Sequence, residues 1–254
     1  MKILLVNKYL YRKGGAETYF IKLGEYLKSL GNEVEYFGMA DERNCVGNRV
    51  EAYTENIDFH KKSLKHITYP FKIIYSVNAR KQIRKVLSNF KPDVVHLNNF
   101  NYQLTPSIIY EIKKHNIPIV YTAHDVQLVC PNHKLKNDYT DGLCRKCDGG
   151  KYFECVKNNC VHSSKIRSIL GAVEAWYYKL RHTYKMIDLT VCPSEFMEKE
   201  ISRNDDINGR TVTMYNFIDE IKPLGAECEN YVFVFRQIFR GKGNIQPCQS
   251  DKET

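Results

Sequence analysis

The residues best suited to chemistry in this sequence follow a short apolar run near the middle of the chain. Residues 119–121 have the pattern of a buried strand, and the polar residues after them include His124 and Asp125. A histidine can gain or lose a proton near neutral pH, and a neighbouring carboxylate can tune its pKa. We therefore predict that His124 and Asp125 are catalytic; the alternative is an ordinary hydrogen-bonded strand end.

Two other pairs of residues lie where predicted strands end. Gly14 and Gly15 fall between a strand and a helix, where free backbone N–H groups and the helix dipole attract phosphate. Asn98 and Asn99 follow another strand. Open parallel sheets bind ligands at the carboxyl ends of their strands, so we predict that all four residues bind a phosphate-bearing ligand. Each pair can also be a plain turn, and the glycines match neither the dinucleotide-binding nor the P-loop spacing.

A cysteine-rich loop interrupts the chain between residues 130 and 163. It holds four closely spaced thiols in surroundings rich in Gly, Lys and Asn: Cys144, Cys147, Cys155 and Cys160. Structural zinc sites use such sets, and we predict that zinc orders this loop because no apolar core is evident there. Substitute ligands are Cys130, His133 and His162, and the alternatives to zinc are reversible disulfides and free thiols.

The elements that must position these residues alternate between strand and helix. The predicted strands cover residues 2–7, 34–39, 93–97, 119–121, 187–192 and 211–214. The predicted helices cover residues 16–30, 105–115, 165–185 and 195–203. Apolar side chains of the third helix are expected to face the sheet, namely Ile169, Ala172, Val173 and Trp176.

This alternation predicts an α/β fold with a doubly wound parallel sheet and a cysteine-rich loop insertion. The domain is expected to cover residues 1–217. From residue 218 the pattern decays, so we expect residues 218–254 to be a linker and the aborted start of a second domain.

The positive charge of the chain is concentrated in one segment. The 254 residues carry a formal net charge of +9, and residues 59–92 hold nine Lys and Arg without any Asp or Glu. Interleaved apolar residues make this segment amphipathic, as expected of a helix or helix pair on anionic lipid. A solvated helix face is the alternative; nucleic acid is not expected, because no nucleic-acid motif accompanies the patch.

Composition also indicates the compartment. No apolar run approaches a signal peptide or the roughly 20 residues of a membrane span. Nine cysteines without an export signal suggest reduced thiols or metal ligands. We expect a cytoplasmic protein, peripheral at the inner face of the membrane.

With these pieces in place, the chain resembles the N-terminal half of a glycosyltransferase family 4 enzyme of GT-B architecture. The resemblance rests on six blocks in order: KGGAETYFIKLGEYLKSLGNEVEYF (13–37), PDVVHLNN (92–99), IPIVYTAHDVQLVCP (117–131), LCRKCDGGKYFECVKNNC (143–160), VCPSEF (191–196) and YNFID (215–219). It implies two facing Rossmann-like domains and retaining transfer of a sugar from a nucleotide-activated donor, without a catalytic metal. The acceptor is then held mainly by the N-terminal domain. By the same resemblance, Gly14 and Gly15 approach the donor diphosphate, and His124 lies beside the transferred sugar.

The sequence departs from the family where a second domain should begin. In the family that domain supplies the nucleotide pocket and an acidic motif near the donor, whereas residues 229–244 look like a damaged version of its first strand and loop. Two hypotheses follow. The chain is an acceptor-side half, inactive alone, that acts with a separately encoded donor domain on a cell-surface polysaccharide or polyprenyl-linked acceptor. Alternatively, it is a non-catalytic remnant or a membrane-associated binding module with a structural zinc loop.

Overall fold

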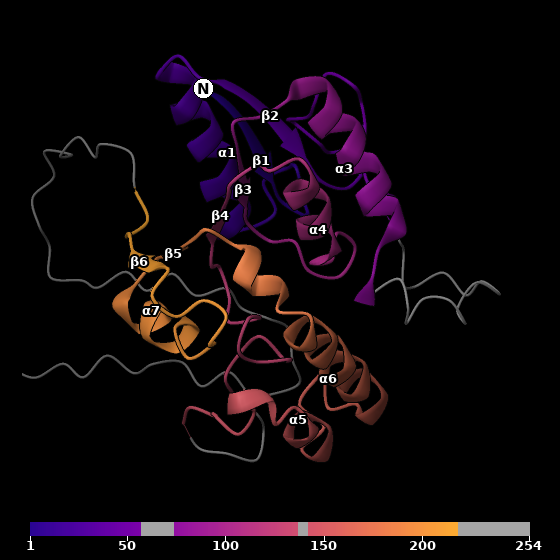
Figure 1. Cartoon of the computed structure of the whole chain (residues 1–254), viewed down its shortest axis with the longest axis vertical. Coiled ribbons are helices and arrows are strands. Elements are labelled where there is room, and N and C mark those ends of the chain that lie inside the picture. Colours follow the sequence, from indigo (N-terminus) through magenta and orange to yellow (C-terminus); the bar gives the residue numbers. More distant parts are fainter. Residues whose placement is uncertain (57–73, 137–141, 218–254) are drawn as a thin grey trace, which may run out of the picture. The chain divides into compact units, whose positions relative to one another are not determined.

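The computed structural model describes residues 1–56, 74–136 and 142–217. Met1–Phe217 form one compact unit, and the predictions made for residues 218–254 lie outside the described residues. The unit alternates strands and helices (Figure 1). In chain order its elements are β1 (Lys2–Val6), α1 (Gly15–Ser29), β2 (Glu33–Phe37), α3 (Val77–Phe90), β3 (Val94–Leu97), α4 (Ser107–Lys114), β4 (Ile119–Thr122), η2 (Asp148–Gly150), α5 (Phe153–Lys157), α6 (Lys165–Leu180), η3 (Thr183–Met186), β5 (Leu189–Cys192), α7 (Glu195–Ile201) and β6 (Thr211–Thr213).

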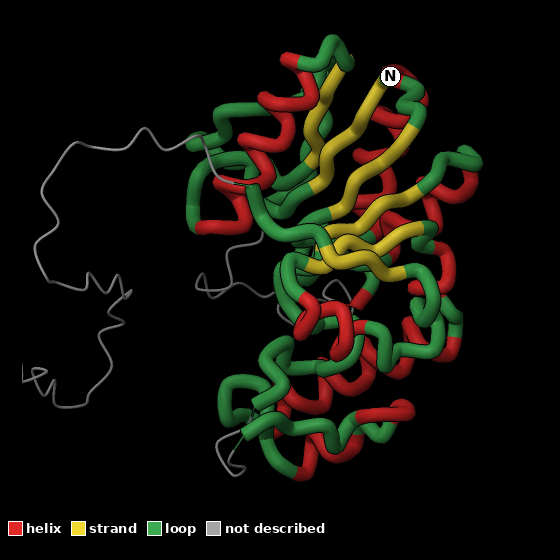
Figure 2. The backbone as a smooth tube through the Cα atoms, turned by 90° about the vertical axis from the view of Figure 1, so that its left-hand side faces the viewer, coloured by secondary structure: helices red, strands yellow, loops and turns green. Residues whose placement is uncertain are grey.

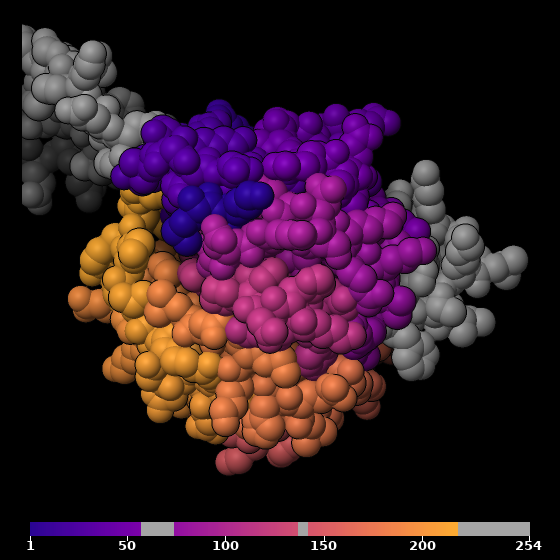
Figure 3. Space-filling model, turned by 45° about the horizontal axis from the view of Figure 1, so that its top comes forward, coloured from indigo at the N-terminus to yellow at the C-terminus, as the bar shows by residue number. Residues whose placement is uncertain are grey.

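The six strands form one parallel sheet in the order β2-β1-β3-β4-β5-β6 (Figure 2). The chain starts with β1, adds β2 as the edge strand on one side of it, and then builds outward from β3 to β6 on the other side. The space-filling view follows a similar progression, from the violet of the first elements to the orange and yellow of those from α6 onward (Figure 3). The predicted doubly wound α/β fold is confirmed.

Helices cover both faces of the sheet, and the side chains of β1 show why. Successive residues of a strand point to opposite faces. Leu4 and Val6 lie in the core that α3 and α4 cover, whereas Ile3 and Leu5 pack with Phe20 of α1. Both faces of this central strand are therefore buried, as a near-continuous apolar run predicts.

The helix α6 turns a different face outward from the one that the sequence suggested. Ala172 is fully buried, as expected, but Ile169, Val173 and Trp176 are 42%, 41% and 37% exposed. The prediction that these three side chains face the sheet is wrong.

Contacts with the cysteine-rich loop explain this orientation. The inner side of α6 at Gly171 faces Pro131 and Val161 of that loop, and Tyr178 is buried in the core. The indole Nε1 of Trp176 donates to the carbonyl of Gly150, 2.9 Å away. The loop therefore occupies the position against α6 that a sheet would otherwise take.

The basic segment is only partly described, because residues 57–73 lie outside the described residues. In the described remainder, α3 buries its apolar face in the core through Ile83, Val86 and Leu87. Those side chains are not available to a lipid surface. Across the parts that the structure describes, no helix combines the length and apolarity needed to cross a bilayer.

Two arginines of α3 are bound to a carboxylate of α4. Glu111 is almost fully buried; it accepts from Arg80 at 2.7 Å and from Arg84 Nε at 2.5 Å. The hydrogen bond from Arg84, reinforced by Arg80 and opposed by burial, lowers the pKa of Glu111 from 4.5 to about 2. A buried carboxylate with two charged donors fixes the packing of α3 against α4.

Glu111→Gln should lower the free energy of unfolding by about 3 kcal/mol at pH 7, since one partner of a buried ion pair is lost. The depressed pKa means that the stabilisation is present above pH 4.5 and is lost as the pH falls toward about 2. Urea unfolding of the wild type and of the variant from pH 7 to pH 3 measures both effects.

The matched control is Glu25→Gln, because the exposed Glu25 lies 3.7 Å from Arg12. It should change stability by less than about 1 kcal/mol. Equal effects of the two substitutions would show that the Glu111 ion pairs do not stabilise the fold.

Candidate active site

The loops that follow β1 and β3 are tied together at the carboxyl edge of the sheet. The backbone N–H of Asn99 donates to Asn7 Oδ1 at 3.0 Å, and the N–H of Lys8 donates to the carbonyl of Asn99 at 2.7 Å. Asn7 Nδ2 also donates to the carbonyl of Tyr9 at 2.7 Å. The backbone of Asn99 thus links two strand ends. The ligand-binding role of its side chain stays a prediction.

His124 and Asn98 form the central pair of the site. The imidazole Nε2 of His124 lies 2.9 Å from Oδ1 of Asn98, a residue with no exposed surface. Burial lowers the pKa of His124 to about 4, against the opposing charge of Asp125. At neutral pH the ring is therefore uncharged, and with the amide in this orientation it carries its proton on Nε2 and leaves Nδ1 as an acceptor.

The other end of the Asn98 amide is a free donor. Its buried Nδ2 has no hydrogen-bond partner among the described residues. Buried donors of this kind are usually satisfied, so a bound ligand or water is the natural acceptor here. A neutral imidazole and an amide donor side by side can bind sugar hydroxyl groups.

A second neutral histidine lies behind this pair. His96 Nε2 on β3 is 2.7 Å from Thr122 Oγ1 on β4. Burial, together with the proximity of His124, lowers the pKa of His96 to about 4. The two strand ends thus present uncharged imidazoles at neutral pH.

Asp125 pairs with a histidine other than its neighbour in the sequence. Its Oδ2 lies 3.3 Å from His133 Nδ1, and its Oδ1 accepts from the N–H of Gln127 at 2.8 Å. Burial opposes protonation of His133, but its hydrogen bond to Asp125 and the charges of Asp125 and Glu174 raise its pKa overall. Asp125 therefore orients the loop that carries His133.

Three residues join His133 that the sequence did not single out. The ring of Tyr102 stacks on His133 with centroids 5.7 Å apart, and Lys8 Nζ lies 4.9 Å from the Tyr102 centroid. Burial raises the pKa of Glu174 on α6 to about 7, against the opposing charge of His133. Lys8 follows the end of β1, so a search for polar residues at strand ends could have predicted it. Glu174 lies within a helix, where no pattern in the sequence marks it as a site residue.

The N-terminus of α1 is directed to the same edge. Tyr19, in the first turns of α1, packs edge-on against His124 with centroids 5.3 Å apart. A Cβ on Gly14 would make an ordinary 3.4 Å contact with Glu17, and one on Gly15 would meet nothing within 4 Å. No contact among the described residues demands these glycines, so the phosphate role of Gly14 and Gly15 stays a prediction that the open space permits.

The predicted zinc ligands come together without forming a ligand set. A cavity of about 10 Å³ is lined by Cys130, Cys144, Cys147, Cys155 and Cys160. Among the described residues, no group of three or more His, Cys, Asp or Glu is arranged to hold a metal ion. Burial raises the pKa of Cys147 to about 12 and that of Cys155 further, and the Cys155 thiol donates to Cys160. The geometry gives the zinc prediction no support.

The loop also has the core that the zinc argument assumed it lacked. Leu135, Tyr152 and Cys155 are 4%, 7% and 1% exposed. Arg145 extends from the loop to the fully buried Glu200 of α7, and its Nε donates to Oε2 at 3.0 Å. Packing and an ion pair therefore order this segment.

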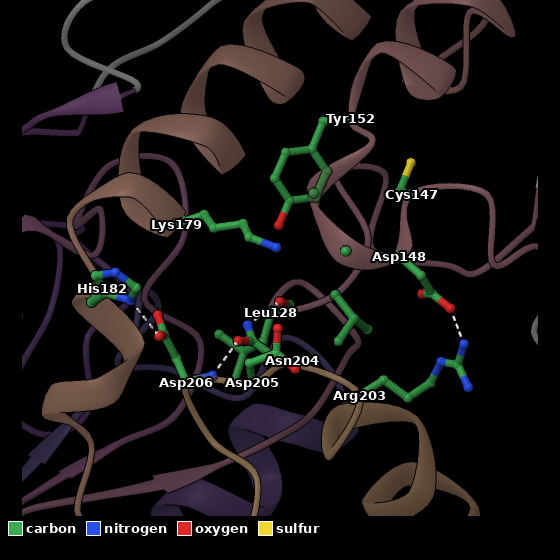
Figure 4. Close-up of a pocket in the computed structure, with 13 residues that line it drawn as sticks. Leu128, Cys147, Asp148, Tyr152, Lys179, His182, Arg203, Asn204, Asp205 and Asp206 are labelled. Atoms are coloured by element: carbon green, nitrogen blue, oxygen red, sulfur yellow. Dashed lines mark hydrogen bonds and ion pairs between the residues drawn. The ribbon is translucent and has the colours of Figure 1, made fainter.

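A separate cavity of about 70 Å³ lies between η2, the end of α6 and the end of α7 (Figure 4). Lys179 points into it, while Arg203 pairs with Asp148 and His182 Nδ1 lies 2.8 Å from Asp206. Ligand pockets usually enclose about 300–1,000 Å³. This cavity holds a few waters at most, and most of its charges are already paired.

Alkylation of the thiols tests the description of the loop. Cys147 and Cys155 should react with iodoacetamide at pH 8 much more slowly than the exposed Cys45, because their raised pKa values leave little thiolate. The rates should be the same with and without a chelator, and in urea all sites should react. Acceleration by the chelator alone would restore the zinc prediction; mass spectrometry of peptides gives each rate.

The pKa values of the two site histidines should be shifted in opposite directions. His124 should stay neutral down to about pH 4, and His133 should stay charged above its ordinary value of 6.5. Burial of His124 therefore destabilises the fold progressively as the pH falls from 6.5 toward 4. The stabilisation from protonated His133 is complete below pH 6.5 and is lost as the pH rises through its raised pKa. Imidazole NMR titration measures both, and Asp125→Asn should lower the pKa of His133. Unchanged His133 titration in that variant would contradict the pairing.

Three known proteins are similar to parts of this chain. An uncharacterized 42.6 kDa protein in the cps region of Klebsiella pneumoniae is 28% identical over 148 residues, which are 53% of this chain and 39% of the relative. Among solved structures, Anabaena Alr3699/HepE in complex with UDP and glucose has 14% identity and a TM-score of 0.46, over 86% of this chain and 45% of that one. Sucrose-phosphate synthase from Thermosynechococcus elongatus has 14% identity and a TM-score of 0.49, over 84% and 47%. The chain thus spans less than half the length of these proteins.

The family assignment rests on a different comparison. The profile of Glycosyltransferase Family 4 matches residues 13–221, which is most of the 254 residues. The match includes every strand after β1 and all the site residues that follow Arg12. The chain therefore belongs to glycosyltransferase family 4.

Proposed function

We propose that Met1–Phe217 form the acceptor-side domain of a retaining glycosyltransferase. The reaction moves a sugar from a nucleotide-sugar donor to a glycan or polyprenyl-linked acceptor of a cell-surface polysaccharide. The observation that supports this most directly is the His124–Asn98 pair at the carboxyl edge of the sheet, in a chain of glycosyltransferase family 4.

In this proposal His124 positions the sugar as a neutral group. Glycosyl transfer passes through a transition state with positive charge on the sugar ring. An imidazolium beside that ring would repel the developing charge, and burial removes this problem by keeping the pKa of His124 at about 4. Asn98 Oδ1 fixes the orientation of the imidazole ring, so that Nδ1 can accept a hydrogen bond from a sugar hydroxyl group. Asp125 then acts as a positioning residue through His133.

The donor meets this domain at the start of α1. Free N–H groups and the positive end of the helix suit a diphosphate, and the open space at Gly15 admits one. The nucleotide itself is held by a further domain, which we propose to be separately encoded. The proposed reaction assigns no metal ion to catalysis.

The location follows from the proposed acceptor. A polyprenyl-linked glycan lies in a bilayer, so the domain works at the inner face of the membrane as a peripheral protein. Its partners are then the sugar nucleotide, the acceptor, the donor domain and an anionic membrane surface, and not nucleic acid.

Reconstitution tests the proposal. The purified 254-residue chain is mixed with labelled UDP- and GDP-sugars and a polyprenyl-diphosphate-linked glycan, with and without a family 4 donor domain encoded beside it. We expect label in the acceptor only when both proteins are present. No transfer in any mixture would favour the non-catalytic binding module.

Substitutions connect the activity to the site. His124→Ala should lower kcat of the reconstituted pair by about 10²-fold or more, as the loss of a positioning and electrostatic contact does. Asn98→Ala should have a smaller effect, about tenfold, because the ring remains but is no longer fixed. The exposed His162→Ala is the matched control and should leave the rate unchanged. A normal rate in His124→Ala would remove His124 from the reaction.

A further inference from the structure

The outer side of α6 carries an exposed apolar stripe. Its five large side chains recur every three or four residues along the helix, so they share one face. Their exposed fractions are 73% for Ile166, 42% for Ile169, 41% for Val173, 37% for Trp176 and 80% for Leu180. Contiguous exposed apolar surface of this kind marks a site of interaction.

The neighbouring helix α5 widens the stripe into a surface. Phe153 of α5 is 52% exposed, and an open groove of about 630 Å³ runs between it and Ile169, Val173 and Trp176. The two helices lie side by side in Figure 1. We call this surface the α5–α6 face; it consists of Phe153 and the five apolar residues of α6.

Basic residues surround this face. Residues 151–181 contain six Lys and Arg and two acidic residues. The exposed cations among them are Lys151, Lys157, Lys165, Arg167 and Arg181. One of the two acids, Glu174, interacts with His133 at the site. That leaves Glu154 of α5 against five exposed cations, so the outer face is net cationic.

The charge and composition of the α5–α6 face indicate what binds to it. Two copies of a cationic face would repel each other, and an anionic surface would be attracted. The spacing of the stripe also suits a coiled coil, but the charges at its flanking positions are Lys165 and Lys179, both positive, which a second copy of the helix would repel. Leu, Ile, Phe and Trp rimmed by Lys and Arg are the composition of helices that lie in a bilayer interface.

We propose that the α5–α6 face docks on an anionic lipid bilayer. The same helix carries Glu174, which is coupled to His133 and Tyr102 at the site. A bilayer on the outer side would thus lie about one helix diameter, roughly 10 Å, from the site. Delivery of a lipid-linked acceptor along this route rests on the proposed function, whereas docking itself does not.

The chain contains a built-in reporter for the test, because Trp176 is its only tryptophan. The purified chain is titrated with vesicles of 30% phosphatidylglycerol in phosphatidylcholine and with pure phosphatidylcholine vesicles. We expect a blue shift of the emission and quenching by brominated lipid with the anionic vesicles. Co-sedimentation at low and high salt gives the partition coefficients.

Three variants locate the contact. Ile166→Gln with Leu180→Gln removes the most exposed apolar side chains, and should weaken binding at least tenfold at any salt concentration. A charge variant, with Lys157, Lys165 and Arg167 changed to Gln, should lose roughly fivefold for each residue at low salt. The matched control on α3 changes Val77, Lys81 and Lys85 to Gln, which are exposed on the predicted basic segment, and should bind within twofold of the parent.

Several outcomes of these binding measurements would contradict docking of the α5–α6 face on a bilayer. Equal binding by parent and α6 variants, loss in the α3 control instead, or no preference for anionic vesicles would each overturn the proposal. Self-association that the α6 variants abolish, without vesicle binding, would assign the face to a second copy. Circular dichroism checks that every variant is folded, and the absence of donor and acceptor separates these results from the test of glycosyl transfer.

Discussion

Parallel pairing of β1 with β3 and of β3 with β4 is the constraint on which the site depends. Because the three strands run the same way and are neighbours, their carboxyl ends meet, and residues distant in the sequence become hydrogen-bond partners. Asn98 and His124 illustrate this, since each directly extends the polar end of its strand. The link from Asn7 to Asn99 holds the first two loops at a fixed separation.

Burial and neighbouring charges then give the histidines at this edge of the sheet different pKa values. Burial lowers the pKa of His96 and His124 to about 4. Burial also opposes protonation of His133, but the hydrogen bond to Asp125 and the charges of Asp125 and Glu174 raise its pKa overall. In the proposed reaction, the uncharged imidazole of His124 suits the reacting sugar. These shifts in pKa arise from the placement of ordinary side chains.

The fold was largely predictable, because buried parallel strands have long apolar runs and their helices have clear periodicity. The sequence did not show which surface each amphipathic helix packs against. The apolar stripes of α3 and α6 look alike in sequence, yet Ile83 lies in the core and Ile166 lies outside. In the candidate site, the positions of His124 and Asn98 after strand ends made them predictable. Glu174 was not predictable, because it lies on a helix that comes close to His133 only in the folded chain. The zinc prediction assumed a coreless loop, but Leu135 and Tyr152 supply a core.

The adjacent residues Asn98 and Asn99 look equivalent in the sequence but differ in what they contribute. Asn98 acts through its amide, which no other side chain reproduces at that length. Asn99 acts through its backbone N–H and carbonyl, which almost every amino acid possesses. The link through position 99 therefore survives substitution during evolution as long as the loop keeps its conformation. The contacts of positions 7 and 98 need an asparagine amide, so divergence at either of these two positions would break them.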